Sequence, residues 1–396
     1  MVPKGWTLLQ VSDICKLQNG NSFKPHEWDT QGLPIIRIQN LNGSDNYNYF
    51  SGVPQDKWLV EPGQLLFSWA GTKGVSFGPF IWNGPKGVLN QHIYKVFANE
   101  NVHGHWLYLA LLHITQKIEA QAHGFKSTLL HVQKKDIDNQ FVLTPPVAEQ
   151  KKIAQILSTW DKAISVTEKL LANSQQQKKA LMQQLLTGEK RLLDENGVRF
   201  SGKWKWLRAA ELFKTISQKN NSEDEELLAV TQDLGVIPRS MLERRVVMPD
   251  GSTKGYKLVV SGNFIISLRS FQGGLEYSRY RGLVSPAYTV LTPIKKIVDE
   301  FYMQYYKSYN FIGHLAVAVI GIRDGKQISY EDFSFLKLPY PEIEEQQKIA
   351  TVLSAADDEI ATLEKKLACL KDEKKALMQQ LLTGKRRVKM DEAVAA

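Results

Sequence analysis

The sequence predicts two globular domains of mixed α/β (α+β) structure, related by a pseudo-two-fold axis and separated by a long antiparallel two-helix coiled coil. Three observations predict this fold: a helix-length segment that occurs twice, apolar residues at a four–three spacing along both copies, and matching strand patterns ahead of each copy. A chain of 396 residues is long enough for two domains of ordinary size.

The repeated segment is the strongest signal in the chain. Residues 146–191 and 342–387 align without a gap at a constant offset of 196, and the string KKALMQQLLTG recurs at 178–188 and 374–384. Such an identity inside a gapless alignment indicates a duplication. Prolines precede both copies, and Gly188 and Gly384 stand where a glycine commonly ends a helix. We expect each copy to form one helix of roughly 60 Å, at about 1.5 Å per residue.

Apolar side chains recur along both copies in the pattern of a coiled-coil seam. Each helix could instead pack on its own domain, but its length favours pairing of the two repeats, and antiparallel pairing leaves each helix tied to its own domain. Lys178 and Lys374 take the same seam position, where a polar side chain either fixes the register or extends its stem past the seam. The predicted seam consists of Ile153, Leu157, Trp160, Ile164, Leu171, Leu181, Leu185, Ile349, Leu353, Ile360, Leu363, Leu367, Leu370, Leu377 and Leu381.

The duplication extends weakly into the segments before the helices. Trp6-x-x-Leu9 resembles Trp204-x-x-Leu207, and residues 62–68 resemble residues 261–267 as a turn followed by a buried strand. The intervening sequence diverges, so the two domains share a frame and differ in their loops. The expected organisation is a first domain at 1–145, a central helix at 146–188, a linker at 189–203, a second domain at 204–340, a C-terminal helix at 341–384 and a tail at 385–396.

Composition narrows the function classes. The formal charge of +9, from 50 basic and 41 acidic residues, suits a polyanionic partner without requiring one. Cys15 and Cys369 are far apart and belong to no Cys/His cluster, so neither a disulfide framework nor a zinc site is predicted, and a reducing cytoplasm fits. No apolar run is long enough for a membrane span or a signal peptide.

Catalytic motifs are weak or missing. Thr144-Pro145-Pro146-Val147 lacks the polar group and the aromatic ring that an adenine methyltransferase uses on a flipped base. Asp250 with Asp324-Gly325-Lys326 imitates a nuclease pattern at too loose a spacing, and His103-Gly104-His105 has no further ligands nearby. No phosphate-binding loop is present. We expect no catalytic residue, no metal site and no cofactor.

The duplicated helix motif is similar to a known family. Pro145-Pro146-x-x-Glu149-Gln150, followed by Ile-Ala, Leu-Ser and KKALMQQLLTG, and occurring twice, resembles the conserved regions of type I restriction–modification specificity (S) subunits. The second copy departs in reading Pro339-Tyr340-Pro341, which leaves the helix register intact. The resemblance covers essentially the whole chain.

The resemblance implies a division of labour. It implies two target recognition domains, each reading one half of a bipartite, asymmetric double-stranded DNA site. It further implies helices that set the spacing and dock two modification (methyltransferase) subunits, which a motor–nuclease restriction subunit then joins. The chain itself would be a non-catalytic subunit. Two alternatives are a coiled-coil protein–protein scaffold that reads no DNA and a stand-alone DNA enzyme.

Loops after the predicted strands carry side chains of the types that contact bases and phosphates. Taken singly, each fits a solvated surface position better than a base contact, but we expect several of them together in the interface. The resemblance transfers none of these positions. In the first domain the candidates are Arg37, Gln39, Asn40, Ser68, Trp69, Lys73, Asn90, Gln91, His92, Lys126 and Ser127. In the second domain they are Gln232, Arg239, Arg269, Ser270, Gln272, Arg279, Arg281, Arg323 and Gln327.

Partner docking is expected on helix faces away from the seam. Residues that are identical in both copies there suggest two equivalent partner sites. The candidates are Gln150, Asp161, Gln183 and Gln184, with their repeats Gln346, Asp357, Gln379 and Gln380.

Overall fold

The computed structural model describes residues 2–121, 129–219, 221–222, 224–242, 253–268, 270–318 and 328–390. The chain divides into two compact units: unit 1 comprises residues 1–167 and 366–396, and unit 2 comprises residues 168–365. Each unit therefore contains one sheet-based domain and a part of both long helices. Within the ranges given above, no helix combines the length and the apolarity that a bilayer crossing requires.

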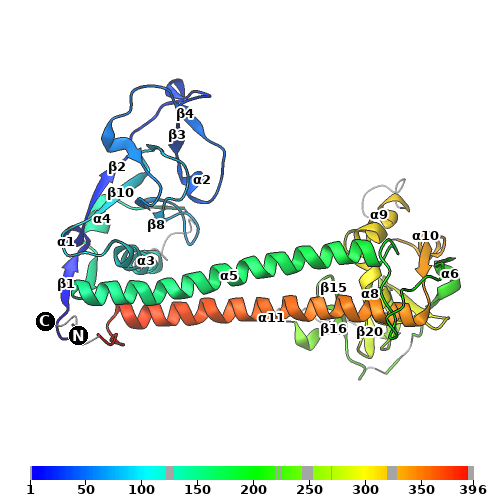
Figure 1. Ribbon diagram of the computed structural model, residues 1–396. Helices are drawn as coiled ribbons and strands as arrows, with labels where there is room; N and C mark the ends of the chain where they lie inside the picture. Colours follow the sequence, from blue (N-terminus) through cyan, green and yellow to red (C-terminus); the bar gives the residue numbers. More distant parts are fainter. Residues whose placement is uncertain are drawn as a thin grey trace. The chain divides into compact units, whose positions relative to one another are not determined.

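Two long helices, α5 (Val147–Leu185) and α11 (Ile343–Leu382), pass from one unit into the other (Figure 1). Acidic residues stand in both first turns, where the positive end of the helix dipole favours them. Gly188 and Gly384 follow the last turns with positive φ angles of 77° and 68°. This left-handed conformation suits glycine and turns the chain away from the helix axis.

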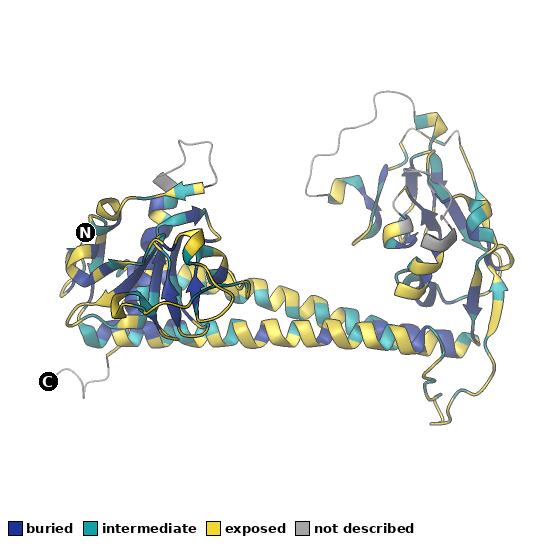
Figure 2. Cartoon of the chain, turned by 90° about the horizontal axis from the view of Figure 1, so that it is seen from above, coloured by how far each residue is buried: buried dark blue, intermediate teal, exposed yellow. Residues whose placement is uncertain are grey.

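The two helices lie antiparallel to each other inside each unit. In unit 1, Ile153 and Leu157 of α5 share an apolar cluster with Leu381 of α11. In unit 2, Leu185 of α5 shares a cluster with Leu353 of α11. Figure 2 shows buried and exposed positions alternating along both helices. The predicted antiparallel coiled coil is thereby confirmed.

The lysines of the seam are paired across it. Lys178 Nζ forms an ion pair with Asp357 Oδ1 in unit 2, and Lys374 Nζ forms the equivalent pair with Asp161 Oδ1 in unit 1. A shift of either helix along the other would separate both pairs. Of the two roles expected for these lysines, their geometry therefore supports fixing the register.

Unit 1 contains a four-stranded antiparallel sheet in the order β2-β10-β6-β8, a mixed sheet in the order β4-β3-β9-β5, and the pairs β1-β12 and β11-β7. In the mixed sheet β3 and β9 run parallel. The strands are β1 (Thr7–Gln10), β2 (Cys15–Asn19), β3 (Leu33–Ile36), β4 (Asn48–Phe50), β5 (Leu59–Val60), β6 (Leu65–Ser68), β7 (Ala70–Thr72), β8 (Gly78–Ile81), β9 (Gly87–Leu89), β10 (Ile93–Ala98), β11 (Leu129–His131) and β12 (Phe141–Thr144).

Unit 2 repeats this frame with fewer strands. Its four-stranded sheet has the order β14-β21-β18-β19, and β13-β22, β15-β16 and β17-β20 form pairs. The strands are β13 (Lys205–Arg208), β14 (Phe213–Ile216), β15 (Leu228–Thr231), β16 (Gly235–Pro238), β17 (Lys257–Val259), β18 (Phe264–Ile266), β19 (Glu276–Tyr277), β20 (Gly282–Val284), β21 (Thr289–Pro293) and β22 (Lys337–Tyr340).

Each unit also contains shorter helices. In unit 1 these are α1 (Val11–Ile14), α2 (Ile38–Leu41), α3 (Gly104–Gln121) and α4 (Lys134–Asp138). In unit 2 they are α6 (Ala209–Leu212), α7 (Ser270–Gly273), α8 (Asp299–Tyr306), α9 (Tyr309–Ala318) and α10 (Tyr330–Ser334). Single 3₁₀ turns occur at Pro25–Glu27, Asp56–Trp58, Arg239–Met241 and Thr253–Gly255.

The core of each unit joins its domain to the long helices. In unit 1 the fully buried Trp106 of α3 and Trp6 lie in the same cluster as the start of α5 and the end of α11. In unit 2 a group of aromatic side chains, Phe213, Phe264, Tyr302 and Tyr306, occupies the corresponding place. Mixed α/β domains on a two-helix coiled coil confirm the predicted fold class.

Candidate functional site

A charged cluster holds the first turn of each long helix. In unit 2, Arg191 donates from Nε and Nη2 to the two oxygens of Glu345, at 2.6 and 2.7 Å, and Trp204 Nε1 donates to the same carboxylate at 2.9 Å. Glu345 is only 1% exposed, so three hydrogen bonds compensate a carboxylate removed from water. We call Glu345, Arg191 and Trp204 the helix-start cluster of unit 2.

Unit 1 contains the same cluster, made from Glu149, Arg387 and Trp6. Arg387 donates to both oxygens of Glu149 at 2.7 Å, and Trp6 Nε1 donates at 2.9 Å. In both units the guanidinium also lies over the indole ring, at 5.5 and 5.7 Å from its centroid. The arginine follows the end of one long helix and the glutamate begins the other, so this contact joins the two repeats.

Four of the helix residues predicted to face outward have contacts inside the protein, and two of them, Gln150 and Gln346, are buried. Gln150 is buried and bonds the amide of His103 at 2.8 Å, while Gln346 bonds the amide of Val298 at 3.0 Å. Asp161 and Asp357 form the ion pairs across the seam. The prediction of a partner surface is wrong for Gln150 and Gln346, because both are buried. Asp161 and Asp357 keep 43% and 44% of their side chains exposed, so for them it stays a prediction. The four other glutamines predicted, Gln183, Gln184, Gln379 and Gln380, are exposed.

In unit 1, the carboxyl ends of three strands meet at one edge. Strands β3 and β9 run parallel, and Asn90 N donates to Ile36 O at 3.0 Å. Strand β6 ends beside them, where Trp69 N donates to His92 O at 3.3 Å. Candidates that are distant in sequence therefore come together: Arg37, Trp69, Asn90 and Gln91.

Trp69 is the centre of an aromatic group at this edge. Its Nε1 donates to Gln91 O at 3.0 Å, and its ring contacts Tyr94, His92 and His131 at centroid distances of 6.1, 5.2 and 4.5 Å. Burial, and then the charge of His131, lower the pKa of His92. A neutral imidazole next to a partly exposed indole offers stacking and hydrogen bonding without fixed charge.

Other candidates of the first domain hold loops in place. Asn40 is buried, accepts from Arg37 N at 2.9 Å and donates to Ser44 O at 2.8 Å. Ser68 is fully buried and donates to Ala70 O. Arg37 lies over the Trp28 ring, and Gln39 is exposed but donates to Asn46 O.

Lys73 belongs to the turn after β7, and its side chain contacts helix α3. Its Nζ donates to Glu119 O at 2.8 Å, and Gly74 N donates to Glu119 Oε1 at 2.7 Å. The loop after β7 is thus attached to the C-terminal part of α3. Lys126 and Ser127 lie outside the described residues.

In unit 2 two candidate glutamines lie on neighbouring loops. Gln232 is exposed in the turn between β15 and β16, and Gln272 is exposed in α7. Ser270 is fully buried and its hydroxyl accepts from Ser267 N at 2.8 Å, so it shapes the loop. Arg269, Arg323 and Gln327 lie outside the described residues.

The three remaining arginines of the second domain have different surroundings. Arg281 forms an exposed ion pair with Glu225 at 2.6 Å. Arg279 is exposed and lies over the Tyr277 ring at 5.6 Å. Arg239 is half-buried at the end of β16, and its Nε has no hydrogen-bond partner among the described residues.

Sequence reasoning missed the charged pair that connects the two glutamine loops. Lys307, directly after α8, forms an ion pair with Glu276 of β19. Burial raises the pKa of Glu276 to about 7, opposed by the hydrogen bond and charge of Lys307. The available signals were a lysine after a run of aromatic residues and a glutamate between Leu275 and Tyr277, since buried charges need partners.

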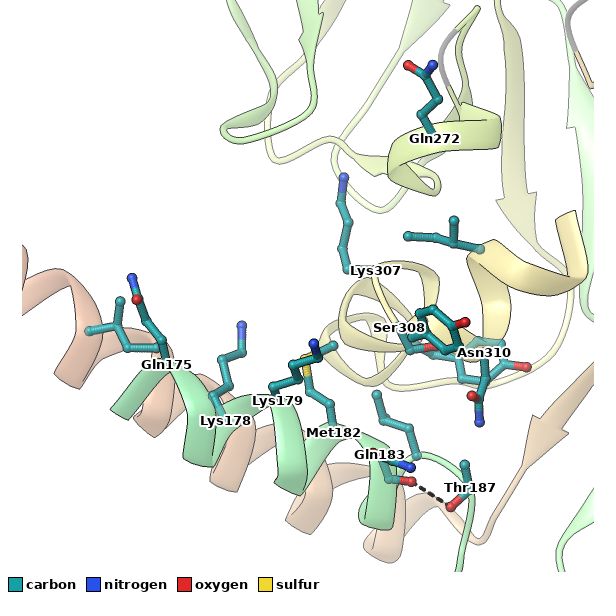
Figure 3. A pocket seen from close by; sticks show the side chains of 15 residues that line it. Gln175, Lys178, Lys179, Met182, Gln183, Thr187, Gln272, Lys307, Ser308 and Asn310 are labelled. Atoms are coloured by element: carbon teal, nitrogen blue, oxygen red, sulfur yellow. Dashed lines mark hydrogen bonds between the residues drawn. The ribbon is translucent and has the colours of Figure 1, made fainter. Parts of the chain in front are cut away.

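A hollow of about 740 Å³ lies beside these residues in unit 2 (Figure 3). Met182, Gln183 and Leu186 of α5 line one side, and Tyr305 and Tyr309 line the other. Figure 3 shows the Lys307 side chain leaving the end of α8 in the direction of the loop that carries Gln272.

The residues that sequence patterns offered for catalysis or metal binding can be located in part. No group of three or more His, Cys, Asp or Glu suited to a metal ion occurs within it. His103 accepts a hydrogen bond from Trp106 N at 3.3 Å, as the cap of a helix does. Asp250 and Asp324-Gly325-Lys326, the nuclease-like pattern, lie outside the described residues.

The two units define a class of protein: a duplicated binding protein in which each sheet-based domain is built onto part of a shared two-helix coiled coil. Both halves of the chain match the family model described as the type I restriction modification DNA specificity domain, over residues 3–173 and 198–372. The chain therefore belongs to the type I restriction–modification DNA specificity family, which confirms the resemblance inferred from the duplicated motif.

Individual relatives agree with this assignment over nearly the full length. A putative type I restriction enzyme MjaX specificity subunit of Methanocaldococcus jannaschii is 27% identical, covering 98% of this chain and 95% of the relative. The MjaVIII specificity subunit of the same organism is 25% identical, covering 98% and 94%.

Solved structures show the same fold. The S subunit of a type I restriction–modification system from M. genitalium has a TM-score of 0.57 at 15% identity and covers 98% of this chain and 97% of its own. A chain from a study of complex assembly and conformational transition of the type I R-M system has a TM-score of 0.59 at 16% identity, with 98% and 100% covered.

Proposed function

We propose that this chain selects the DNA site for a type I restriction–modification complex, with residues 1–145 reading one half of a bipartite, asymmetric site and residues 204–340 reading the other. One observation carries the proposal. The sheets share one strand order, β2-β10-β6-β8 and β14-β21-β18-β19, while the loops at their edges differ in sequence and in anchoring. A common frame with unlike loops suits two unlike half-sites.

We assign the base and phosphate contacts to side chains that stay accessible at these edges. In the first domain Arg37, Trp69, Asn90 and Gln91 lie together, and in the second Gln232 and Gln272 lie on adjoining loops. Asn40, Ser68 and Ser270 would instead give the loops their shape, since their polar groups bond the backbone. Arginine and amide side chains suit the readout of guanine and adenine edges.

The long helices have two proposed roles. Helix α5 has 39 residues, which corresponds to about 58 Å at about 1.5 Å per residue. Half-sites on one face of B-DNA are separated by multiples of about 34 Å, so stiff helices of this length suit a fixed spacing. The exposed, duplicated glutamines around Gln183 and Gln379 would contribute to docking two modification subunits, which a restriction subunit joins.

We further propose that the chain performs no chemistry itself and acts in the cytoplasm. The residues that sequence patterns offered for catalysis have structural contacts where they are described, as His103 does. Methyl transfer and cleavage would then belong to the partner subunits.

Methylome sequencing of cells that express this chain with its modification subunit tests the proposal. The expected result is methylation at a split, asymmetric motif. Exchange of residues 204–340 for the matching domain of a relative should change one half of that motif and leave the other half intact. Methylation at a continuous site, or a change in both halves, would contradict the proposal that each domain reads one half-site independently.

The alternative is a coiled-coil scaffold that binds proteins alone. A salt titration of binding to duplex DNA separates the two functions. Binding to DNA phosphates releases counterions. For a DNA-binding protein, the logarithm of the binding constant therefore falls linearly with the logarithm of the salt concentration. A scaffold would show no measurable binding even at about 50 mM salt.

A further inference from the structure

We propose that Lys307 is a positioning residue for recognition of the second half-site: its ammonium group holds the loops that carry Gln232 and Gln272 in one fixed arrangement. This inference rests on the proposed function, because it assumes that residues 204–340 read DNA. It assigns to Lys307 a role that requires no contact with the bases.

All three donors of the Lys307 ammonium are used. The Nζ atom donates to Glu276 Oε1, to Gln232 O at 3.0 Å and to Gly273 O at 3.0 Å. These acceptors come from the β15–β16 turn, the end of α7 and strand β19. A lysine ammonium has three donors and no acceptor, so the site matches its full capacity.

The loops that carry Gln232 and Gln272 are closely packed against each other and against the end of α8. A Cβ atom on Gly273 would lie 2.6 Å from Gln232 Nε2, so the Gln232 side chain covers this glycine. Gly274 has a φ of +77°, and a Cβ atom there would lie 1.7 Å from Tyr306 O at the end of α8. The loop therefore packs directly on the helix end from which Lys307 extends.

Glu276 makes the arrangement specific for a cation. Its side chain is 2% exposed, so an ionised carboxylate there needs a compensating charge. The charged groups facing it are Lys307, at the end of α8, and Asp233, in the β15–β16 turn, which repels it. Replacing Lys307 by an apolar residue would leave Glu276 and two carbonyl groups without their donor.

Among the described residues of the first domain, the position equivalent to Lys307 carries no ammonium group. The contacts of Gln150 with His103 and of Gln346 with Val298 relate the domain helices at an offset of 195, which places Leu112 at the position of Lys307. There the loop after β7 is attached through Glu119, whose carbonyl accepts from the loop's own Lys73 and whose carboxylate accepts from Gly74 N. Loss of Lys307 should therefore affect one half-site alone, and the other half serves as an internal control.

The test is methylome sequencing of cells that express the full chain with its modification subunit. Lys307→Met should lower the preference at one or more base positions of the second half-site by about tenfold, with the first half-site unchanged. Hydrogen exchange of the purified chain should show faster exchange in residues 231–235 and 270–274. Lys295→Met, the same loss of charge at an exposed position, should leave the base preference unchanged at both half-sites.

A double variant separates positioning from stability. Lys307→Met with Glu276→Leu removes both charges, so it should recover most of the loss in denaturation midpoint that Lys307→Met causes. It still lacks the donor to Gln232 O and Gly273 O, so second-half preference should stay relaxed. Recovery of preference in the double variant, equal losses at both halves, or no loss at all in Lys307→Met would overturn the inference. A wild-type chain that directs no bipartite methylation would overturn the proposed function and this inference with it.

Discussion

Unit 1 and unit 2 hold their long helices alike and their loops differently. The helix-start cluster is the same in both, with Glu149 bound by Arg387 and Glu345 bound by Arg191. In unit 1 the loop after β7 is attached to α3 by its own Lys73 and by Glu119 of the helix, whereas in unit 2 the lysine, Lys307, comes from the end of α8 and donates to the loops. The duplication has thus been kept where the repeats contact each other and has diverged at the candidate reading edges.

The difference separates two kinds of constraint. A buried carboxylate between two repeats restricts both repeats at once, so substitutions on either side are costly. Loop attachments involve one domain only, and several polar arrangements can satisfy the same backbone groups. Measurements that compare equivalent positions in the two units can therefore test how far the equivalence extends.

The largest effect is expected at the helix-start clusters. Glu345→Ala leaves the Arg191 guanidinium and the Trp204 indole without their acceptor, and should lower the free energy of unfolding by about 3–5 kcal/mol. Glu149→Ala should cost somewhat less, because Arg387 is 44% exposed against 20% for Arg191. Urea denaturation measures both, and the exposed neighbour variant Glu344→Ala should stay within about 0.5 kcal/mol of wild type. Equal, small losses for all three would show that the clusters contribute little.

The next effect concerns the seam, where the two units should respond equally. Leu157 in unit 1 and Leu353 in unit 2 are both fully buried repeats of one position. Truncation of either to alanine should cost about 3 kcal/mol through lost burial and the cavity left behind. Leu170→Ala, on an exposed face of the same helix, is the matched control. A large inequality between Leu157→Ala and Leu353→Ala would break the equivalence of the two halves of the seam.

A smaller effect is expected from Glu276, which has no counterpart in unit 1. Burial raises its pKa to about 7 from an ordinary 4.5. Because the pKa is higher in the folded chain than in the unfolded chain, protonation of Glu276 stabilises the fold. This contribution is complete at pH values below the ordinary pKa of 4.5 and is lost as the pH rises through about 7. The stability of wild type relative to Glu276→Gln should therefore fall by about 1–3 kcal/mol between pH 5 and pH 8. Denaturation at both pH values measures this, and Glu195→Gln, an exposed control, should show no such trend.

The smallest effect distinguishes His113 in unit 1 from Ser308, its equivalent in unit 2. Neither ring nitrogen of His113 has a hydrogen-bond partner among the described residues, and burial lowers its pKa to about 4. His113→Leu should stabilise the chain by about 1 kcal/mol at pH 7, since it removes buried, unpaired polar atoms. It should also remove a loss of stability that wild type shows as pH falls below about 6.5.

Substitution of Ser308 should change the free energy of unfolding in the opposite direction. Its hydroxyl accepts from Phe311 N at 3.2 Å, so Ser308→Leu should destabilise by about 1 kcal/mol. Thermal or chemical denaturation of the two variants side by side compares them. If both substitutions changed the stability in the same direction, the two units would not differ at this position.

The sequence predicts the long helices better than it predicts their contacts with the domains. The coiled coil was predictable because its packing repeats every seven residues, so the order of Leu157, Ile164 and Leu171 reports it directly. The buried state of Gln150 was not, because an amide on a helix reads as polar surface until its partner, the amide of His103, is placed beside it. Local spacing carries no information on such distant contacts.

The same limit applies to the candidate site. Strand-end loops were identified from turn patterns, and Arg37, Trp69, Asn90 and Gln91 do converge. Ser68 and Ser270 were indistinguishable by residue type from base-contacting serines, and their burial depends on the whole sheet. Lys307 escaped notice because its three acceptors, Gln232, Gly273 and Glu276, are spread over the sequence and two of them are backbone groups.

The helix-start cluster of unit 1 has a consequence for biosynthesis. Unit 2 is one continuous stretch, residues 168–365, so a growing polypeptide holds all its parts once residue 365 has been added. Unit 1 combines residues 1–167 with residues that follow unit 2, and Glu149 receives Arg387 from a position 238 residues further along the chain. A nascent chain that stops between these two points therefore holds all of unit 2, while the Glu149 carboxylate of unit 1 still lacks its arginine.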